Sequence, residues 1–428
     1  MPRPLSRRHF LGASTAGAFW IVRQSFARIS PNEKLNLGVI GVGGRGGENL
    51  KEVSGENIVA LCDVDDNTLA AAAKLHPGAK TYNDFQKLIA QNDIDAIVIG
   101  TPDHVHAVQA MAALQSGRHV YCEKPLTRTI SEARAVTELA RKKKLITQIG
   151  TQIHAGNNYR RVVELVQSGV IGAVREVHVW VTATYGGMDL PKTYPPAPPH
   201  LHYDLWLGPV PERPYSPEWV PFKWRHWWAF GGGSLADFGC HFMDLPHWAL
   251  GLSQPLSAEV IDGPPVHAES TPLWLMVSYQ YPARGEKPPV HLTWYHGGKQ
   301  PPPAILPESY AMKWKSGVLF IGDKGQVLSD YGKHLLLPEK QFEGFKRPEP
   351  FLANSIGHHK EWIKAVKTGG VTTCHFDYSG PLTEAALLGN VAYRTGKKIE
   401  WDARNLKARN CPEAERYIQH EYRKGWKL

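Results

Sequence analysis

The chain has 428 residues, of which 42% are hydrophobic and 21% are charged, a composition typical of globular proteins with two or three domains and not of disordered, collagenous or repeat proteins. The 49 Lys and Arg exceed the 40 Asp and Glu, but residues 1–27 and 391–428 carry this excess of +9 and residues 28–390 are neutral. The charge therefore does not indicate a nucleic-acid partner.

The first 27 residues contain a pair of arginines before a short apolar run. Ser6-Arg7-Arg8-His9-Phe10-Leu11-Gly12 precedes residues 13–22, and Ser25-Phe26-Ala27 follows as a small-x-small cleavage site. This pattern resembles a twin-arginine signal peptide; a chance arginine pair on an N-terminal helix is the alternative. Because the apolar run is too short to span a bilayer, the resemblance implies export of a folded protein to the periplasm, with no membrane attachment after signal removal.

A glycine-rich turn follows the first predicted strand. Residues 34–41 read as a buried parallel strand, and residues 57–63 read as a second strand that ends in an acid 22 residues after the first glycine of the turn. This spacing is typical of dinucleotide-binding domains, in which backbone N–H groups approach a pyrophosphate and the acid binds ribose hydroxyls. A glycine-rich surface turn is the alternative. We expect dinucleotide contacts from Gly41, Gly43, Gly44, Arg45, Gly46 and Asp63.

Strands and helices alternate from there to residue 150. Helices are expected at 66–75 and 84–91, and strands near 80–82 and at 94–99, 119–122 and 145–149. This order predicts a doubly wound parallel sheet with ligands at the carboxyl ends of its strands. Gly100-Thr101-Pro102-Asp103-His104-Val105-His106 and Glu123-Lys124-Pro125 follow two of these strands and therefore lie at the predicted site.

The identity of the dinucleotide depends on two charges of opposite sign. Asp63 favours NAD, since a carboxylate repels the 2′-phosphate of NADP. Arg45 in the glycine turn could instead pair with a phosphate. We expect NAD, with NADP as the alternative.

The second half of the chain has fewer regular signals. A helix is expected at 158–168, ended by Gly169, and strands at 171–182, 273–281, 290–295 and 317–321. Ten prolines in residues 191–221 predict an irregular loop. Two helices are expected at 358–368 and 381–395, the second packing back on the dinucleotide domain.

Residues 231–244 combine a glycine run with charged side chains. Asp237, His241 and Asp244 are spaced i, i+4 and i+7 and are predicted on one face of a helix. A carboxylate next to an imidazole raises its basicity, as a general base requires; a buried histidine satisfied by its neighbours is the alternative. An aromatic-rich region before this helix suggests a sugar site, or else a cover for the sheet, and its candidate substrate contacts are Tyr185, Trp206, Arg225 and Trp227.

Neither cysteine nor histidine spacing indicates a metal. The five cysteines form no CxxC pair and are expected to be packed thiols. His200, His202, His358 and His359 match no metal-binding spacing, and no metal is expected.

The motifs Gly41–Gly46, Cys62-Asp63, Thr101–His106, Glu123-Lys124-Pro125 and Asp237–His241 resemble the Gfo/Idh/MocA oxidoreductase family over residues 34–402. The resemblance implies a Rossmann domain at 34–150, an α/β domain with a large open-faced, mostly antiparallel sheet at 151–402, and a basic tail at 403–428. It implies that Lys124, Asp237 and His241 are catalytic, with Lys124 touching nicotinamide and substrate. Further cofactor contacts are expected from Thr101, Pro102, His104, His106, Glu123 and Thr151.

The function implied is hydride transfer between NAD(P) and a hydroxyl of a sugar, polyol or glycoside. The alternative is an NAD-dependent glycosidase that oxidises a hydroxyl transiently and recycles its cofactor. Relatives that cleave N-acetylgalactosaminides differ at the segment Asp237–Phe242 and lack the counterpart of Lys124, which makes that particular activity doubtful. A sugar-binding module that keeps the cofactor only structurally is a third hypothesis. The open sheet face, expected to be apolar, implies a homo-oligomer.

Overall fold

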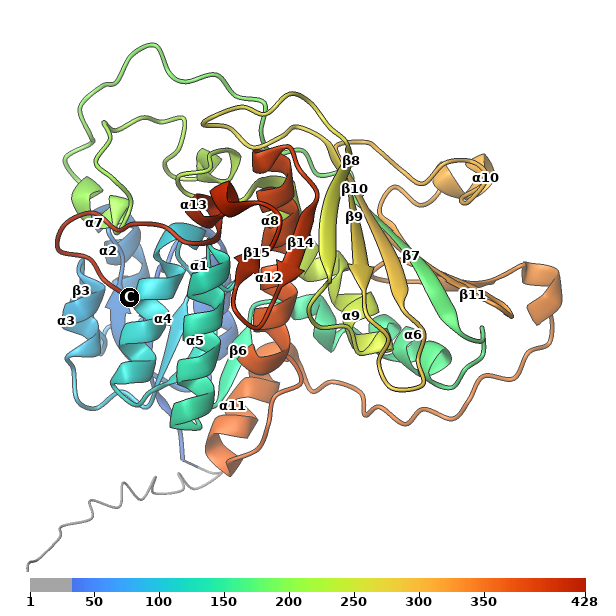
Figure 1. Ribbon diagram of the computed structural model, residues 1–428. Coiled ribbons are helices and arrows are strands. Elements are labelled where there is room, and N and C mark those ends of the chain that lie inside the picture. Colours follow the sequence, from blue (N-terminus) through green and yellow to red (C-terminus); the bar gives the residue numbers. More distant parts are fainter. Residues whose placement is uncertain (1–32) are drawn as a thin grey trace, which may run out of the picture.

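The computed structural model describes residues 33–428 as two sheets with helices packed around and between them (Figure 1). The predicted signal segment, residues 1–27, lies outside the described residues. Within residues 33–428, no helix has both the length and the apolar character that crossing a membrane requires. All five cysteines are buried free thiols, as expected.

The first sheet has six parallel strands in the order β3-β2-β1-β4-β5-β6, which confirms the doubly wound prediction. The central strand β4 is buried at every residue, as in parallel sheets covered on both faces. The strands are β1 (Asn36–Ile40), β2 (Asn57–Cys62), β3 (Lys80–Tyr82), β4 (Ala96–Ile99), β5 (His119–Cys122) and β6 (Thr147–Ile149). The helices are α1 (Gly44–Val53), α2 (Asp66–Leu75), α3 (Phe85–Ile89), α4 (Asp103–Gln115) and α5 (Ile130–Lys143).

The second sheet has nine strands in the order β13-β12-β11-β7-β10-β9-β8-β14-β15. Neighbours are antiparallel except β7 and β10, which run parallel, so the expected mostly antiparallel sheet is confirmed. Its strands are β7 (Val174–Trp180), β8 (Ser257–Asp262), β9 (Leu275–Tyr281), β10 (Val290–His296), β11 (Gly317–Gly322), β12 (Gly325–Ser329), β13 (His334–Leu337), β14 (Ile399–Asp402) and β15 (Lys407–Ala408). The other helices are α6 (Asn157–Gln167), α7 (Tyr203–Leu207), α8 (Gly233–Phe242), α9 (Asp244–Leu250), α10 (Glu308–Ala311), α11 (His358–Thr368), α12 (Phe376–Thr395) and α13 (Glu415–Ile418).

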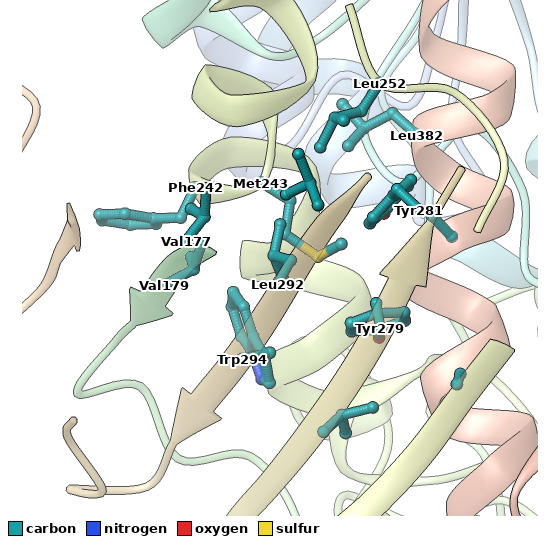
Figure 2. Close-up of a cluster of buried hydrophobic side chains, with 14 of the residues drawn as sticks. Val177, Val179, Phe242, Met243, Leu252, Tyr279, Tyr281, Leu292, Trp294 and Leu382 are labelled. Carbon is teal, nitrogen blue, oxygen red and sulfur yellow. The ribbon is translucent and has the colours of Figure 1, made fainter. Parts of the chain in front are cut away.

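The main core lies between one face of this sheet and the helices α6, α8, α9 and α12. Alternate residues of each strand point into it because side chains alternate along a strand, as Val177 and Val179 of β7 and Leu292 and Trp294 of β10 do. Figure 2 shows these residues around Met243 at the end of α8. This packing fixes the position of α8 next to the site described below.

The opposite sheet face differs from the expected apolar surface. Its central positions are largely polar, and His178 bonds to Glu176 and to Tyr295 there. The apolar side chains on this face are covered by Leu306 and Trp314 of the chain's own segment 297–316. The apolar surface that the resemblance implied is therefore absent from this face in the described residues.

Two C-terminal segments bind the domains together. Helix α12 packs against α5 of the first domain, as predicted, although it begins five residues before Pro381. The segment expected as a basic tail is packed, with Tyr422 donating to Glu132 of α5 at 2.6 Å and Trp426 lying 6.1 Å from the ring of Phe85. The C-terminus therefore lies over the first domain (Figure 1).

Candidate active site

The glycine turn forms a cradle at the start of α1. Gly41 and Gly44 have φ values of +78° and +49°, which favour glycine. A Cβ on Gly46 would lie 2.0 Å from the carbonyl oxygen of Gly41, so only glycine fits. Helix α1 starts without a side-chain cap, which leaves its first N–H groups for an anion such as a pyrophosphate. The residues present therefore fit a dinucleotide.

Asp63 lies beside this turn at the end of β2. Its carboxylate accepts the N–H of Val42 at 2.9 Å and that of Asp65 at 3.0 Å. Burial raises the pKa of Asp63, and these N–H groups oppose that effect. Each carboxylate oxygen keeps a lone pair that a ribose hydroxyl could use.

Arg45 turns toward Glu123 at the other side of the cradle. Its Nε lies 3.2 Å from Glu123, and it also pairs with Glu48. Glu123 further accepts bonds from Asn49 at 3.0 Å and Gln152 at 2.8 Å. Arg45 is already paired with two carboxylates and is not free to bind a 2′-phosphate. Asp63 and Asp65, which follow β2, lie where the adenosine ribose is expected and would repel that phosphate, so this arrangement favours NAD.

The resemblance implied cofactor contacts from the Thr101–His106 segment, and the structure shows side chains of this segment bonded to other parts of the chain. Pro102 precedes α4 as its N-cap, and the Thr101 hydroxyl donates to Gln109 at 2.6 Å. His106 is fully buried, with its ring nitrogens 2.7 Å and 2.8 Å from the carbonyl oxygens of Thr101 and Pro125. His106 therefore fixes the backbone on both sides of the site.

His104 and Thr151 are also buried and bonded to backbone. His104 Nε2 lies 2.7 Å from the carbonyl oxygen of Trp206, and burial lowers the pKa of His104 to about 3. Thr151 donates to the carbonyl of Cys240 in α8 at 3.1 Å. Both residues connect the first domain to segments of the second.

Lys124 and Asp237 form the centre of the site. The Lys124 Nζ lies 2.5 Å from Asp237 Oδ1 and 3.2 Å from the Asp237 carbonyl oxygen, and Arg225 Nε lies 3.3 Å from the same carboxylate. Burial opposes both charges, but their mutual attraction outweighs it, so the pKa of Lys124 is raised and that of Asp237 is lowered. Two cations share one anion, and the group keeps one net positive charge.

His241 is close to this group but does not have the expected partner. Asp237 bonds to Lys124 and Arg225, and the buried Nδ1 of His241 has no hydrogen-bond partner within residues 33–428. Burial and the Lys124 charge lower the pKa of His241 to about 3, although Asp237 opposes them. The expectation that Asp237 raises the basicity of His241 above the ordinary level is therefore wrong, and His241 is neutral at neutral pH.

Asp244 was predicted on the same helical face, and the structure places it elsewhere. Helix α8 ends at Phe242, and Asp244 starts α9. Its carboxylate lies 2.9 Å from His154 Nδ1 and accepts the Tyr378 hydroxyl at 2.6 Å. The ligating atoms of His154, Asp244 and Cys374 lie within 4.8 Å of one another, but His154 and Tyr378 already engage the carboxylate in a buried hydrogen-bonded cluster.

The predicted substrate contacts divide into two pairs. Trp206 and Trp227 are 5% and 0% exposed in a separate hydrophobic cluster, so they cannot stack on a sugar, and that expectation is wrong. Arg225 bonds to Asp237, and Tyr185 stacks on Phe238 of α8 at 6.1 Å. Arg225 and Tyr185 therefore remain candidate substrate contacts.

Two further residues were missed from the sequence. Tyr331, between β12 and β13, has its ring 6.3 Å from that of His241, and no local pattern marks it. Asp103 is buried close to the same charged group. Burial and the Asp237 charge raise the pKa of Asp103 well above its ordinary value, although the charges of Arg225 and Lys124 oppose this rise. Its position in the Thr101–His106 motif could have identified Asp103.

Family models match both halves of this arrangement. Residues 35–151 match "Oxidoreductase family, NAD-binding Rossmann fold", and residues 156–287 match "Oxidoreductase family, C-terminal alpha/beta domain". Together the two matches cover more than half of the chain. The chain belongs to the Gfo/Idh/MocA oxidoreductase family. Its first domain is an NAD-binding Rossmann domain of that family.

Individual curated proteins are similar to only about a third of this chain. Inositol 2-dehydrogenase of Salmonella paratyphi B is 35% identical over 150 residues, 34% of this chain and 45% of that protein. A glycosyl hydrolase family 109 protein of Solibacter usitatus is 36% identical over 173 residues, 35% of this chain and 38% of that protein. The matches span less than half the length of these curated relatives.

A solved structure has the same fold over most of the chain. The WlbA dehydrogenase from Bordetella pertussis, in complex with NADH and UDP-GlcNAcA, superposes with a TM-score of 0.62 over 86% of this chain and 99% of that chain. The sequence identity is 16%, so this likeness shows the fold.

Proposed function

We propose that the protein is an NAD-dependent oxidoreductase that oxidises a secondary hydroxyl of a sugar, polyol or glycoside. The observation that carries the proposal is the contact between Lys124 of the NAD-binding domain and Asp237 of α8, 2.5 Å apart. The pair joins the NAD-binding domain to α8, and together with Arg225 it carries one net positive charge. The substrate class is supported by the inositol 2-dehydrogenase relative, whose name gives a polyol substrate, and by the WlbA dehydrogenase, whose structure holds UDP-GlcNAcA.

The side chains have complementary roles in this reaction. NAD supplies the hydride acceptor when bound. His241 is neutral at neutral pH and accepts the proton of the substrate hydroxyl. Lys124, held by Asp237, stabilises the negative charge that develops on the substrate oxygen. Arg225 bonds to the same oxygen of Asp237, Oδ1, as Lys124 does, and because the two cations share this one anion, the carboxylate does not neutralise Lys124 completely.

The test is the Lys124→Ala variant. We expect its kcat/KM to fall by about 100-fold or more, since removing one group that stabilises a developing oxyanion has that effect, while bound NAD is unchanged. Lys143→Ala, at an exposed lysine of α5 that donates to the Gln115 carbonyl, is the control. Wild-type turnover in a folded Lys124→Ala protein would disprove the proposal.

An NAD-dependent glycosidase is the second candidate, and the family 109 relative supports it. The two functions differ in their cofactor balance. A dehydrogenase releases NADH in step with substrate consumption, whereas a glycosidase releases an aglycone and returns its cofactor to NAD. Measuring both products with a panel of inositols, sugars and aryl glycosides separates them.

We also propose that the protein is exported by the twin-arginine route and retains its NAD. The arginine pair at 7–8 supports export after folding. Residues 200–202 support retention, because they pair with the chain just after Asp63, the expected ribose contact, and so bring the proline-rich loop next to the cofactor site. His202 N donates to Val64 O at 2.8 Å, and Asp66 N donates to His200 O at 2.9 Å. We expect purified mature protein to begin near residue 28 and to release dinucleotide on denaturation. An intact N-terminus, or a protein without dinucleotide that binds NAD only at millimolar concentration, would refute these two proposals separately.

A homo-oligomer is a further proposal. Its support is the sheet face opposite α6, α9 and α12, where the central polar residue Gln280 is exposed and Glu176 and His291 are only partly buried, so that a polar contact with a second copy is open to them. Light scattering at micromolar concentration should give a multiple of the monomer mass, and a monomeric mass would refute it.

A further inference from the structure

A small pocket outside the active site is lined by positive charge. It forms where the chain after Lys124, the glycine run before α8, helix α12 and the C-terminal segment meet. Its charged or ionisable lining side chains are Arg128, Arg394, Tyr417 and His420, and its lining contains no Asp or Glu. The pocket therefore concentrates positive charge without a matching carboxylate.

Neither arginine has an acid within ion-pair distance in residues 33–428, although Glu132 acts on Arg128 and Glu269 on Arg394 from further away. Among the ion pairs of residues 33–428, none includes Arg128 or Arg394. Arg128 donates to the Trp228 carbonyl at 3.3 Å, while its buried Nε has no partner. Its near neighbour Glu132 is already engaged by Thr129 N–H at 2.9 Å and by the Tyr422 hydroxyl. The pocket therefore contains an unused guanidinium donor.

Arg394 is held in place without having its charge neutralised. Its guanidinium lies 4.9 Å from the centre of the Trp228 ring and 3.9 Å from that of Tyr417, contacts that orient a cation and only partly compensate its charge. Burial, together with the positive charge of Arg128, lowers the pKa of Arg394 to about 10. A bound anion would remove this penalty, because buried charge is stable only when paired.

We infer that this pocket binds one small inorganic anion, held by Arg128 and Arg394. The cavity measures about 20 Å³, and since about 10–15 Å³ holds one water, the space suits a single small ion. Guanidinium groups present N–H donors in a planar fork that suits oxyanions, and they also bind halides.

The position of the pocket gives the anion a structural effect on the active site. Gly231 and Gly232 line it directly before α8, and Asn390 of α12 donates to the Gly232 carbonyl at 2.8 Å. Arg128 lies four residues after Lys124. An anion between Arg128 and Arg394 therefore fixes the start of α8 relative to the Lys124 loop, and this site is independent of the reaction proposed above.

The test uses full-length protein saturated with NAD, so that the glycine cradle cannot take up the added anion. Inorganic phosphate and chloride are titrated separately at constant ionic strength, and the melting temperature is followed. We expect a saturable rise for one or both anions and at least a tenfold weaker affinity in Arg394→Gln and Arg128→Gln. Arg416→Gln is the matched control, since exposed Arg416 contacts the same Tyr417 ring at 4.7 Å outside the pocket.

A second measurement needs no variant. Crystals of the wild-type protein grown in bromide should show an anomalous scattering peak between the guanidinium groups of Arg128 and Arg394. Absence of both a saturable effect and a peak would overturn the inference. Affinities unchanged in both pocket variants would overturn it as well, because the anion would then bind elsewhere.

Discussion

Asp237 organises the active site through two cations, and this arrangement decides the protonation of Lys124. Burial alone would lower the pKa of Lys124, and the Asp237 carboxylate at 2.5 Å raises it instead. The sequence suggested that the Asp237 carboxylate would bond to His241, one helical turn away. In the structure the carboxylate instead bonds to Lys124, a residue of the other domain.

The Asp237→Asn variant tests this relation. We expect the pKa of Lys124 to fall, since burial and the Arg225 charge lower it and only the weaker attraction of Glu123 is left to raise it. The rate at which an amine-selective reagent labels Lys124, followed by peptide mass spectrometry against pH, should shift to lower pH. Turnover should fall about 100-fold or more. Asp189→Asn, at an exposed loop position, should leave both unchanged, and an unshifted labelling profile in Asp237→Asn would contradict the assignment.

The C-terminal segment acts as an element that holds the proline-rich loop in place. Arg423 bonds to Asp204 at 2.5 Å and to the carbonyl oxygens of Gly208 and Asp204 at 2.6 Å and 2.7 Å. These bonds reach α7, which follows directly on the residues paired with the chain after Asp63. The loop is irregular, as its prolines predict, and other parts of the chain keep it ordered.

The Arg423→Ala variant should therefore loosen this loop more than the rest of the molecule. We expect faster amide hydrogen exchange in residues 201–210 and faster NAD release. The expected loss of stability is about 1–2 kcal/mol, because the exposed ion pair contributes little and the two carbonyl bonds contribute most. Lys424→Ala, at the neighbouring exposed lysine, is the control. Unchanged exchange in residues 201–210 would show that the loop is held without Arg423.

Buried neutral histidines set the response of the whole molecule to acid. Burial lowers the pKa values of His104, His358 and His241 to about 3 and those of His247 and His296 to about 4. In the unfolded chain these groups bind protons near pH 6.5. Below that pH the unfolded state binds more protons than the folded state, so the free energy of unfolding falls as pH decreases.

Urea unfolding should show this directly. We expect similar midpoints at pH 7.5 and 8.5 and a progressive fall from about pH 6.5 to pH 4, with each such histidine contributing up to about 1.4 kcal/mol per pH unit. His104→Gln, which keeps a donor for the Trp206 carbonyl, should reduce the slope of this fall. A stability that does not change between pH 7.5 and pH 5 would contradict the burial of these groups in neutral form.

The sequence by itself determined the features that depend on neighbouring residues. The order of strands and helices in residues 34–150, the glycine turn and the acid that ends β2 follow from hydrophobic periodicity and from conformations open only to glycine. These signals are local, because they arise from the backbone of a few consecutive residues. The same holds for the prolines that predicted an irregular loop.

Tertiary structure alone decided which side chains meet. Lys124 and Asp237 are 113 residues apart, and only the packing of α8 beneath the first domain brings them together. Trp206 and Trp227 read as sugar-stacking residues from composition, yet the proline-rich loop folds into a small core of its own and buries them. Residues 403–428 read as a charged tail because the apolar surface that receives Tyr422 and Trp426 belongs to distant segments. Side-chain partners depend on long-range packing, which the local pattern of residues does not contain.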